Sequence, residues 1–420
     1  MTACGLDFGT SNSAIGVVRG DAPALAPLEE GRTLMPSAVF FDLERRGPVE
    51  RTVLFGSEAM AAYVGQVDGR LLRALKSILG SALIDEQTSL GKRKLQLRDV
   101  VAMFVRHLKQ KAEAFAGREI TAVVHGRPVR FVDDDDEADA RAERVLENVA
   151  RQVGFRDVAF VYEPIAAAHH YEQTVQAEEL VLVADIGGGT SDFSVIRIGP
   201  ERRGRADRGR DVLSTGGVRV GGTDFDRLLS LAAVMPLLGL GSQLVEKDLP
   251  MPNALYHELA AWATINFAYS HRNERELGEM VQRAREPEKV GRLLRVVRQR
   301  LGHRVASAVE DAKMALSDAP CTAIGLAFLE AGLAARAARA DFERAIDGAT
   351  ERLHRTARAC IADAGLGGGA IDTIFLTGGS SRVPAVRAAV AGAAPSARIA
   401  TGSDFLSVAL GLTHMARRMA

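Results

Sequence analysis

The sequence holds little cysteine and few aromatic residues. Among its 420 residues are three cysteines and one tryptophan, and Phe, Trp and Tyr together make up 5%. Cys4, Cys321 and Cys360 are odd in number and far apart, which excludes a disulfide framework and the close spacing of a zinc site. We expect reduced thiols that pack as small buried residues in a cytoplasmic protein.

Long apolar runs and an excess of one charge are also missing. No stretch reaches the roughly 18 apolar residues that a membrane-spanning helix needs, and the nearest candidate, 228–245, is broken by Pro236. The N-terminus shows no basic segment ahead of an apolar one, so we expect no secretory signal. Basic and acidic residues number 53 each, which argues against a strongly basic nucleic-acid binder. We expect neither nucleic acid nor a membrane as a partner.

The chain has the composition of an ordinary globular protein, and its sequence predicts alternating strands and helices. Apolar residues make up 47% and charged residues 25%, and the length predicts two or three domains. Apolar residues at helical spacing predict helices at 100–116 and 138–153, whereas short apolar runs predict strands at 120–124 and 158–161. This alternation indicates an α/β fold.

One hairpin pattern occurs twice. Extended runs at 3–9 and 14–19 flank a polar turn, and runs at 179–186 and 193–198 flank a second one. Both turns follow an aspartate and carry glycine, threonine and serine in the same order. The repeat indicates two similar halves that face each other.

Three glycine-rich turns, 9–11, 187–190 and 378–380, each follow an apolar strand and carry the candidate chemistry. Glycine lets backbone N–H groups approach and bind a phosphate, and the neighbouring hydroxyls add donors. Asp7 and Asp185, just before the first two turns, suit a magnesium ion, which is held by one or two carboxylates and by phosphate oxygens. The chain has no P-loop sequence and no dinucleotide-binding glycine pattern, so those two site types are excluded.

Three further features have structural explanations that we prefer to functional ones. The acidic run 133–137 precedes a helix, where the helix dipole favours negative charge, so we expect a solvated helix start rather than a metal site. The arginine-rich segment 201–211 is expected to be a solvated hairpin loop rather than a surface for an anionic partner. His125 is expected to pack rather than to catalyse.

Seven short motifs follow one another along nearly the whole chain: GLDFGTSNSAIGVV (5–18), LKSILG (75–80), YEPIAAA (162–168), VADIGGGTSDFSV (183–195), VGGTDFD (220–226), VEDAKMALS (309–317) and LTGGSSRVP (376–384). They resemble, in this order, the first phosphate loop, the catalytic-lysine segment, the connecting motif, the second phosphate loop, the next marker motif, the adenine-contacting helix and the adenosine motif of the heat-shock-protein-70 (DnaK) family of actin-like ATPases. The stretch VVHGRPVRF (123–131) departs from the usual family sequence and resembles the short YegD-like branch of that family.

The resemblance implies a role for each matching position. The catalytic residues would be Lys76, Glu163, Asp185, Thr190 and Asp7, with ATP or ADP as the bound nucleotide. Asp7 and Asp185 would hold Mg²⁺, and Asp192 would lie beside it or bind K⁺. The nucleotide contacts would be Gly9, Thr10, Ser11, Asn12, Gly187, Gly188, Gly189, Thr190, Gly221, Gly222, Glu310, Lys313, Met314, Ser317, Gly378, Gly379, Ser380, Arg382 and Asp404.

The resemblance also implies an actin-like α/β fold of two lobes, each with a ribonuclease-H-like core and an insert. Lobe I would comprise 1–175 and 400–420, with its insert at about 37–104. Lobe II would comprise 176–399, with a mostly helical insert at about 224–345. The nucleotide would bind between the lobes and drive a hinge motion. The chain ends soon after the last motif, so we expect no C-terminal peptide-binding domain.

Three functions remain open. We expect first a slow, magnesium-dependent ATPase of the heat-shock-70 type, a monomer whose conformational change signals to an unidentified protein partner or client. Met314 stands where the family has an arginine stacked on adenine, which favours a nucleotide-gated scaffold or an actin-like assembling protein with little hydrolysis. A small-molecule kinase of the same superfamily is the third, although the sequence offers no convincing aspartate base for it.

Overall fold

The structure is a computed structural model, and it describes residues 2–20, 22–45, 47–48, 52–65, 67–90, 93–203, 205, 208–246, 248–402 and 406–417. The chain forms two compact units. The first comprises Met1–Gly221, Glu351–Ser381 and Val386–Ala420, and the second comprises Gly222–Thr350 and Arg382–Ala385.

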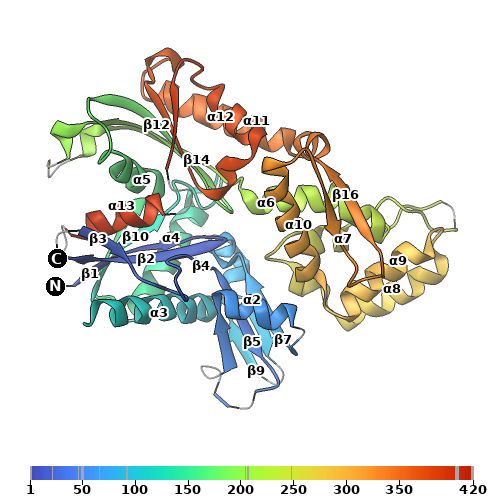
Figure 1. Cartoon of the computed structure of the whole chain (residues 1–420). Coiled ribbons are helices and arrows are strands. Elements are labelled where there is room, and N and C mark those ends of the chain that lie inside the picture. The colour runs from blue at the N-terminus through green and yellow to red at the C-terminus, as the bar shows by residue number, and fades with distance from the viewer. Residues whose placement is uncertain are drawn as a thin grey trace. The chain divides into compact units, whose positions relative to one another are not determined.

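The first large sheet of the first unit contains the predicted N-terminal hairpin. Its strands lie in the order β11-β10-β1-β2-β3 (Figure 1). The N-terminal strand β1 is antiparallel to β2 and parallel to β10, and β10 is parallel to β11. The bounds are Ala3–Phe8 for β1, Asn12–Arg19 for β2, Ala22–Leu25 for β3, Ala122–Arg127 for β10 and Asp157–Tyr162 for β11, while the short β4 (Met35–Pro36) also pairs with β2.

The second large sheet repeats this topology strand for strand. Its order is β14-β13-β12-β17-β18, with β12 antiparallel to β13 and parallel to β17. The sequence repeat of two hairpins is therefore confirmed as β1–β2 and β12–β13. The bounds are Glu179–Ile186 for β12, Ser191–Ile198 for β13, Val212–Val218 for β14, Thr373–Thr377 for β17 and Arg398–Thr401 for β18.

Two helices of the first unit, α5 (Glu163–Tyr171) and α13 (Ser407–Ala416), cross with almost no space between their backbones (Figure 1). A Cβ added to Gly411 would overlap the carbonyl oxygen of Ala166, and one added to Gly5 of β1 would overlap the backbone of Thr413. The three consecutive alanines of α5 are fully buried in the same core as residues of both large sheets. This unit also contains α3 (Leu97–Ala116), α4 (Asp136–Gln152), most of α12 (Pro384–Ala391) and the C-terminal part of α11 (Arg339–Asp363).

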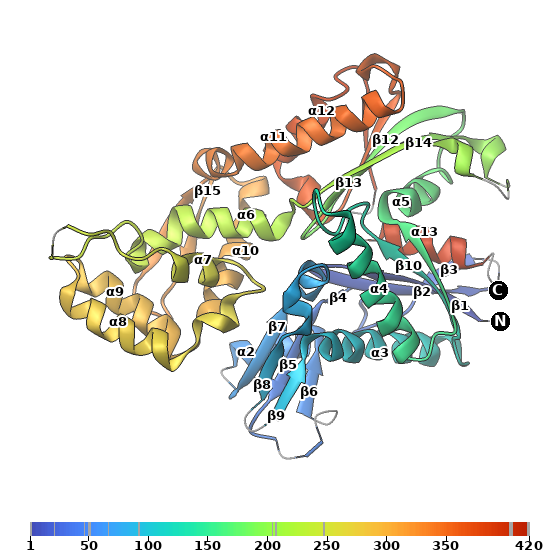
Figure 2. The ribbon, with the colours of Figure 1, turned by 180° about the vertical axis from the view of Figure 1, so that it is seen from behind.

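A smaller α/β subdomain lies within the predicted insert of lobe I (Figure 2). Its sheet has the order β6-β5-β7, and Phe40 and Leu71 pack with the α2 residue Ala59 in its core. A second hairpin, β8–β9, follows it. The bounds are Ala38–Asp42 for β5, Val53–Phe55 for β6, Gly56–Val64 for α2, Gly69–Arg73 for β7, Leu75–Ile78 for η1, Ala82–Asp85 for η2, Gln87–Leu90 for β8 and Arg93–Gln96 for β9.

The second unit is mostly helical. It also contains a hairpin of β15 (Cys321–Gly325) and β16 (Ala334–Ala338). The apolar pattern does not predict this hairpin, because β16 consists of alanines and one arginine. The helices are α6 (Gly222–Leu229), η5 (Ser230–Val234), η6 (Met235–Leu238), α7 (Ala254–Ala260), η7 (Ile265–Ala268), α8 (His271–Arg283), α9 (Pro287–Arg298) and α10 (Gly302–Asp318).

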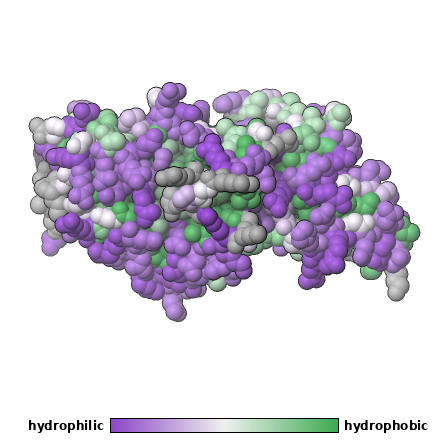
Figure 3. All heavy atoms as spheres, turned by 90° about the horizontal axis from the view of Figure 1, so that it is seen from below, coloured by the Kyte–Doolittle hydropathy of each residue, from purple (hydrophilic) through white to green (hydrophobic). Residues whose placement is uncertain are grey.

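Hydrophilic residues cover most of the face shown in Figure 3. Among the described residues, no helix is both long and apolar enough to cross a membrane. Cys4 and Cys360 are buried, as expected, but Cys321 is exposed, so the expectation that it packs inside is wrong. Cys321 is the first residue of β15, a strand of a two-stranded hairpin that leaves most of its side chains accessible.

The arginine-rich segment 201–211 is not simply a solvated loop. Arg208 is buried and donates both terminal nitrogens to the carboxylate of Glu172, at 2.7 and 2.8 Å, at the end of α5. Arg202 pairs with Glu178 and Asp211. The expectation fails for these arginines because their acidic partners lie mostly outside the segment.

The acidic run 133–137 divides into different roles. Asp135 caps α4 by accepting a hydrogen bond from the backbone N–H of Ala138 at 2.9 Å, and the side chain of Asp136 is 88% exposed. These two residues confirm a solvated helix start. Asp136 also forms an exposed ion pair with Arg130, and Asp133, which is only 25% exposed, pairs with Arg352.

We predict that Gly411→Ala destabilises the protein by about 1–3 kcal/mol, because the added methyl group forces α5 and α13 apart. The control is Gly348→Ala, an exposed position inside α11 with open space around it, which should be stabilising by about 0.5–1 kcal/mol. Scanning calorimetry should show a lower Tm for the first variant and an equal or higher Tm for the second. Equal Tm shifts would contradict the close helix crossing.

Candidate functional site

The glycine-rich turns predicted to bind phosphate meet in the first unit. A Cβ on Gly188 would overlap the hydroxyl of Ser11, and one on Gly189 would lie 2.8 Å from Oγ1 of Thr10. A Cβ on Gly221 would lie 2.6 Å from the carbonyl carbon of Gly188. Side chains at these glycines would therefore collide with the neighbouring turn, so glycine is required for the approach.

The third glycine-rich turn joins the same place. Gly378 has a φ of 79°, which favours glycine, and a Cβ there would overlap the carbonyl oxygen of Ile186 and lie 2.7 Å from Oδ1 of Asp185. The hydroxyl of Ser380 donates to the carbonyl oxygen of Gly187 at 3.0 Å. The structure thus brings the turns 9–12, 187–190 and 378–380 together.

Hydrogen bonds fix the shapes of the first two turns. The N–H of Gly9 donates to the hydroxyl of Ser13 at 3.2 Å, and the hydroxyl of Ser37 donates to the carbonyl oxygen of Gly9 at 2.7 Å. In the second turn the N–H of Gly187 donates to the carbonyl oxygen of Thr190 at 2.9 Å. Each turn is therefore held in its shape by hydrogen bonds of its own or of a neighbouring side chain.

Lys76 and Glu163, 87 positions apart, form a buried ion pair beside these turns. Lys76 belongs to the short turn η1, which follows Ala74 at a φ of 57°. Glu163 is the first residue of α5, with Pro164 after it. Burial opposes the charged form of Lys76, but the attraction of Glu163 and Asp7 outweighs it, so the pKa of Lys76 lies above its ordinary value.

Three aspartates surround this ion pair. Burial, reinforced by repulsion from Glu163, raises the pKa of Asp7 and of Asp185 well above the ordinary carboxyl range. The same two causes raise the pKa of Asp192 to about 8, although Asp192 accepts a hydrogen bond from the N–H of Val129 at 2.5 Å and another from Thr190. Four carboxylates and one ammonium therefore share a site that lacks enough positive charge.

The excess of buried carboxylates fits a magnesium–phosphate complex. Within the described part of the chain, no group of three or more His, Cys, Asp or Glu side chains is placed to hold a metal by itself. Magnesium needs less, because it keeps several waters and takes one or two carboxylates together with phosphate oxygens. Asp7 and Asp185 are placed for that role beside the glycine turns, and the assignment stays a prediction.

The predicted adenosine contacts on α10 belong to the second unit. Lys313 is buried and pairs with Asp226 at 2.7 Å, and its ammonium also donates to the carbonyl oxygen of Gly222 at 3.2 Å. Glu310, Lys313 and Ser317 are three and four positions apart, so they share one face of α10. Met314, next to Lys313, is 55% exposed. Their contact with nucleotide stays a prediction.

Two predicted positions complete the list. Arg382 is exposed at the end of η9 (Gly379–Arg382), and Asp404 lies outside the described residues. His125 is buried and bonded to the carbonyl oxygen of Gly126, and burial lowers its pKa to about 4. It is a neutral packed side chain, as predicted.

Sequence reasoning missed the partners that hold predicted residues. The side chain of Trp262 donates to Asp226 at 3.1 Å, and Asp226 in turn holds Lys313. Asp226 is the last residue of the motif VGGTDFD (220–226). The sequence therefore singles out this aspartate, but it does not indicate that Asp226 pairs with Lys313 and Trp262.

The family model described as Hsp70 protein matches residues 3–234 and 291–400. The chain belongs to the Hsp70 family, a family of nucleotide-binding, chaperone-type ATPases, and it has the actin-like α/β fold. The likeness to the short YegD-like branch stays a prediction.

We predict that Asp192 makes stability depend on pH. Between its ordinary pKa of 3.8 and the folded-state value of about 8, the folded protein binds more protons than the unfolded chain. The free energy of unfolding therefore falls as pH rises through this window. Scanning calorimetry without divalent cations should show a shallower fall in Tm from pH 5.5 to 8.5 for Asp192→Asn than for the wild type.

The matched control is Asp68→Asn, which changes an exposed aspartate and should leave the slope at the wild-type value. Identical slopes for wild type and Asp192→Asn would show that the Asp192 carboxyl titrates normally.

Proposed function

We propose that this protein binds ATP with magnesium and hydrolyses it slowly, and that the nucleotide state controls its conformation. The observation that carries the proposal is the meeting of three glycine-rich turns beside the buried Lys76–Glu163 pair. Family membership supports nucleotide binding and ATPase activity. Because the turns belong to matching hairpins of two repeated sheets, the phosphates would be contacted from both hairpins.

The phosphates would lie against backbone N–H groups and hydroxyls of the turns 9–12 and 187–190. Such donors are fixed in advance, so they stabilise charge on phosphate oxygens without rearranging. Thr10, whose hydroxyl lies close to Gly189, and Thr190 supply hydroxyls at the junction of the two turns.

Lys76 would stabilise the charge that develops on the γ-phosphate. Its ammonium is kept protonated by the surrounding carboxylates, since its pKa is raised. Glu163 both holds this ammonium and is available to orient the attacking water, as hydrolysis needs positioning more than covalent chemistry. Bound Mg²⁺ would supply positive charge that bridges phosphate oxygens.

Asp7 and Asp185 would hold this ion, and Asp192 would lie beside it or bind K⁺. We also propose that the protein acts as a cytoplasmic monomer on an unidentified protein client. We further propose the lobe boundaries expected from the sequence, with lobe I at 1–175 and 400–420 and lobe II at 176–399.

Removing the lysine or the metal-side aspartate tests the proposal. We expect Lys76→Met and Asp185→Asn each to lower kcat for phosphate release by about 10²–10³-fold, because each removes a charge at the reacting phosphate. Lys94→Met, at an exposed lysine of β9, is the control and should keep wild-type turnover. Phosphate release unaffected in both site variants would exclude the mechanism.

The exposed Met314 favours a second function, a nucleotide-gated scaffold or an actin-like assembling protein. Without the planar cation of an arginine, the base would be held less firmly and hydrolysis would be slower. Sedimentation with and without ATP and Mg²⁺, run beside the hydrolysis assay, separates the two functions. A single monomeric species with clear turnover supports the ATPase, whereas ATP-dependent assembly with little turnover supports the scaffold.

A further inference from the structure

The segment 127–139, which begins inside the stretch 123–131 that departs from the family pattern, folds around one arginine side chain. Arg127 is buried, and its guanidinium donates to the carbonyl oxygens of Pro128 and Val129 at 2.9 and 3.2 Å. It also pairs with Asp139 at 2.8 Å, and Asp139 accepts a hydrogen bond from the N–H of Phe131 at 2.5 Å. The segment is therefore held in one shape by its own side chains.

One end of this segment touches the candidate site and the strand β14. The N–H of Val129 donates to Asp192. A Cβ on Gly217 of β14 would lie 2.9 Å from Oδ1 of Asp192 and 3.1 Å from the nitrogen of Arg130. β14 is thus packed directly against the segment at Gly217, where there is no space for a side chain.

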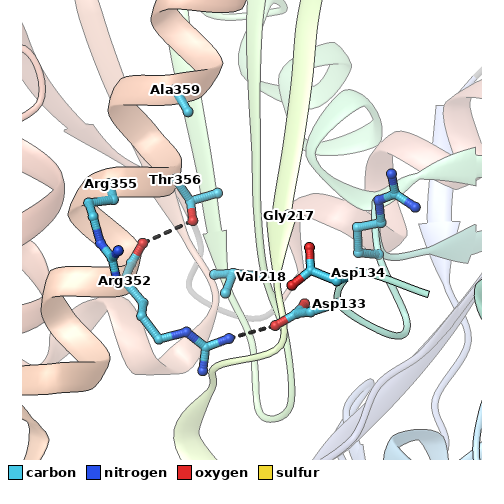
Figure 4. A pocket seen from close by; sticks show the side chains of 9 residues that line it. Asp133, Asp134, Gly217, Val218, Arg352, Arg355, Thr356 and Ala359 are labelled. Carbon is cyan, nitrogen blue, oxygen red and sulfur yellow. Dashed lines mark hydrogen bonds and ion pairs between the residues drawn. The ribbon is translucent and has the colours of Figure 1, made fainter. Parts of the chain in front are cut away.

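The other end of the segment carries Asp133, which connects two further elements. Its carboxylate accepts a hydrogen bond from the N–H of Arg219 at 2.7 Å and pairs with Arg352 of α11 at 2.6 Å. Figure 4 shows Asp133 and Arg352 meeting across a cavity of about 380 Å³ beside Gly217 and Val218 of β14. The Asp133 side chain is only 25% exposed, whereas that of Asp136, which pairs with Arg130, is 88% exposed.

Arg219 continues this chain of contacts to the catalytic lysine. Its guanidinium donates to the carbonyl oxygen of Ser77 at 3.0 Å, and Ser77 directly follows Lys76 in the turn η1. Ala74, before this turn, has the left-handed conformation that non-glycine residues rarely adopt, and such a backbone persists only where its surroundings hold it. A Cβ on Gly80 would overlap Val132, so the turn also packs on the segment itself.

We propose that Asp133 and Arg219 are positioning residues for Lys76: Asp133 fixes the backbone of Arg219, and the Arg219 guanidinium fixes the turn that presents the lysine. The inference rests on the proposed function for its effect on turnover. Its structural part, the holding of residues 74–80, stands on the contacts alone.

Two variants remove separate links of this chain. Asp133→Ala removes the carboxylate that accepts from Arg219, whereas Arg219→Met keeps the aliphatic stem and removes only the donors to Ser77. We expect each to lower kcat about threefold to tenfold with KM for ATP changed less than twofold, since a displaced lysine affects the reacting phosphate more than nucleotide binding. The double variant should lose no more than the larger single loss, because both changes break one chain.

Two further variants separate positioning from general packing. Arg219→Lys keeps the stem and a charged donor, so it should recover most of the kcat that Arg219→Met loses. Asp136→Ala makes the same substitution as Asp133→Ala three residues along. It breaks only an exposed ion pair with Arg130, which contributes little, and leaves the contacts of Arg219 in place, so it should behave as the wild type. Purely structural damage would lower Tm and change both Arg219 variants alike.

Amide hydrogen exchange provides a readout that does not depend on turnover. Residues 74–80 should exchange faster in Asp133→Ala and Arg219→Met than in the wild type, Arg219→Lys and Asp136→Ala. Exchange at the wild-type rate in Arg219→Met, or an unchanged kcat despite faster exchange, would overturn the positioning role. A wild-type protein without turnover would contradict the proposed function instead, and the exchange data would still decide whether Asp133 and Arg219 hold the turn.

Discussion

The structure of the site depends on one imbalance of buried charge. Lys76 is surrounded by Glu163, Asp7, Asp185 and Asp192, so one ammonium faces four carboxylates in a place shielded from water. Burying more carboxylates than cations is costly, and this cost raises the pKa values of the three aspartates. In the proposed function, a magnesium ion bound with the phosphates would balance this negative charge. The same imbalance keeps Lys76 protonated.

The fold places this charge by using one hairpin design twice. Each hairpin presents an aspartate at or near the end of its first strand and a glycine-rich turn directly after it. Glycine is needed where the two turns approach, because a side chain at Gly188 or Gly189 would strike the opposite hydroxyls. The close crossing of α5 and α13 then fixes Glu163, since α5 begins at that residue. The sheet topology therefore places the aspartates and glycine turns of the site, and the helix packing places Glu163.

Much of this arrangement could be predicted from local sequence, because the relevant signals are local. Alternating apolar strands, glycine turns and helical spacing identify both hairpins, the long helices and the family. Contacts between distant residues leave no such signal. The arginines of 201–211 look like those of a solvated loop, and only the fold brings Glu172 beside Arg208. The β15–β16 hairpin was missed for a different reason, since its alanines have little strand preference of their own.

The two halves of the Lys76–Glu163 pair are supported in different ways. Glu163 is attached to a buried helix whose alanines pack in the main core, so disturbing it means disturbing the fold. Lys76 comes from a short turn with a left-handed residue before it, and it relies on side chains from other elements. The contacts of Asp133 and Arg219 lie near the surface and carry little of the core packing. The lysine half therefore depends on contacts outside the main core, and the proposed positioning role of Asp133 and Arg219 rests on these contacts.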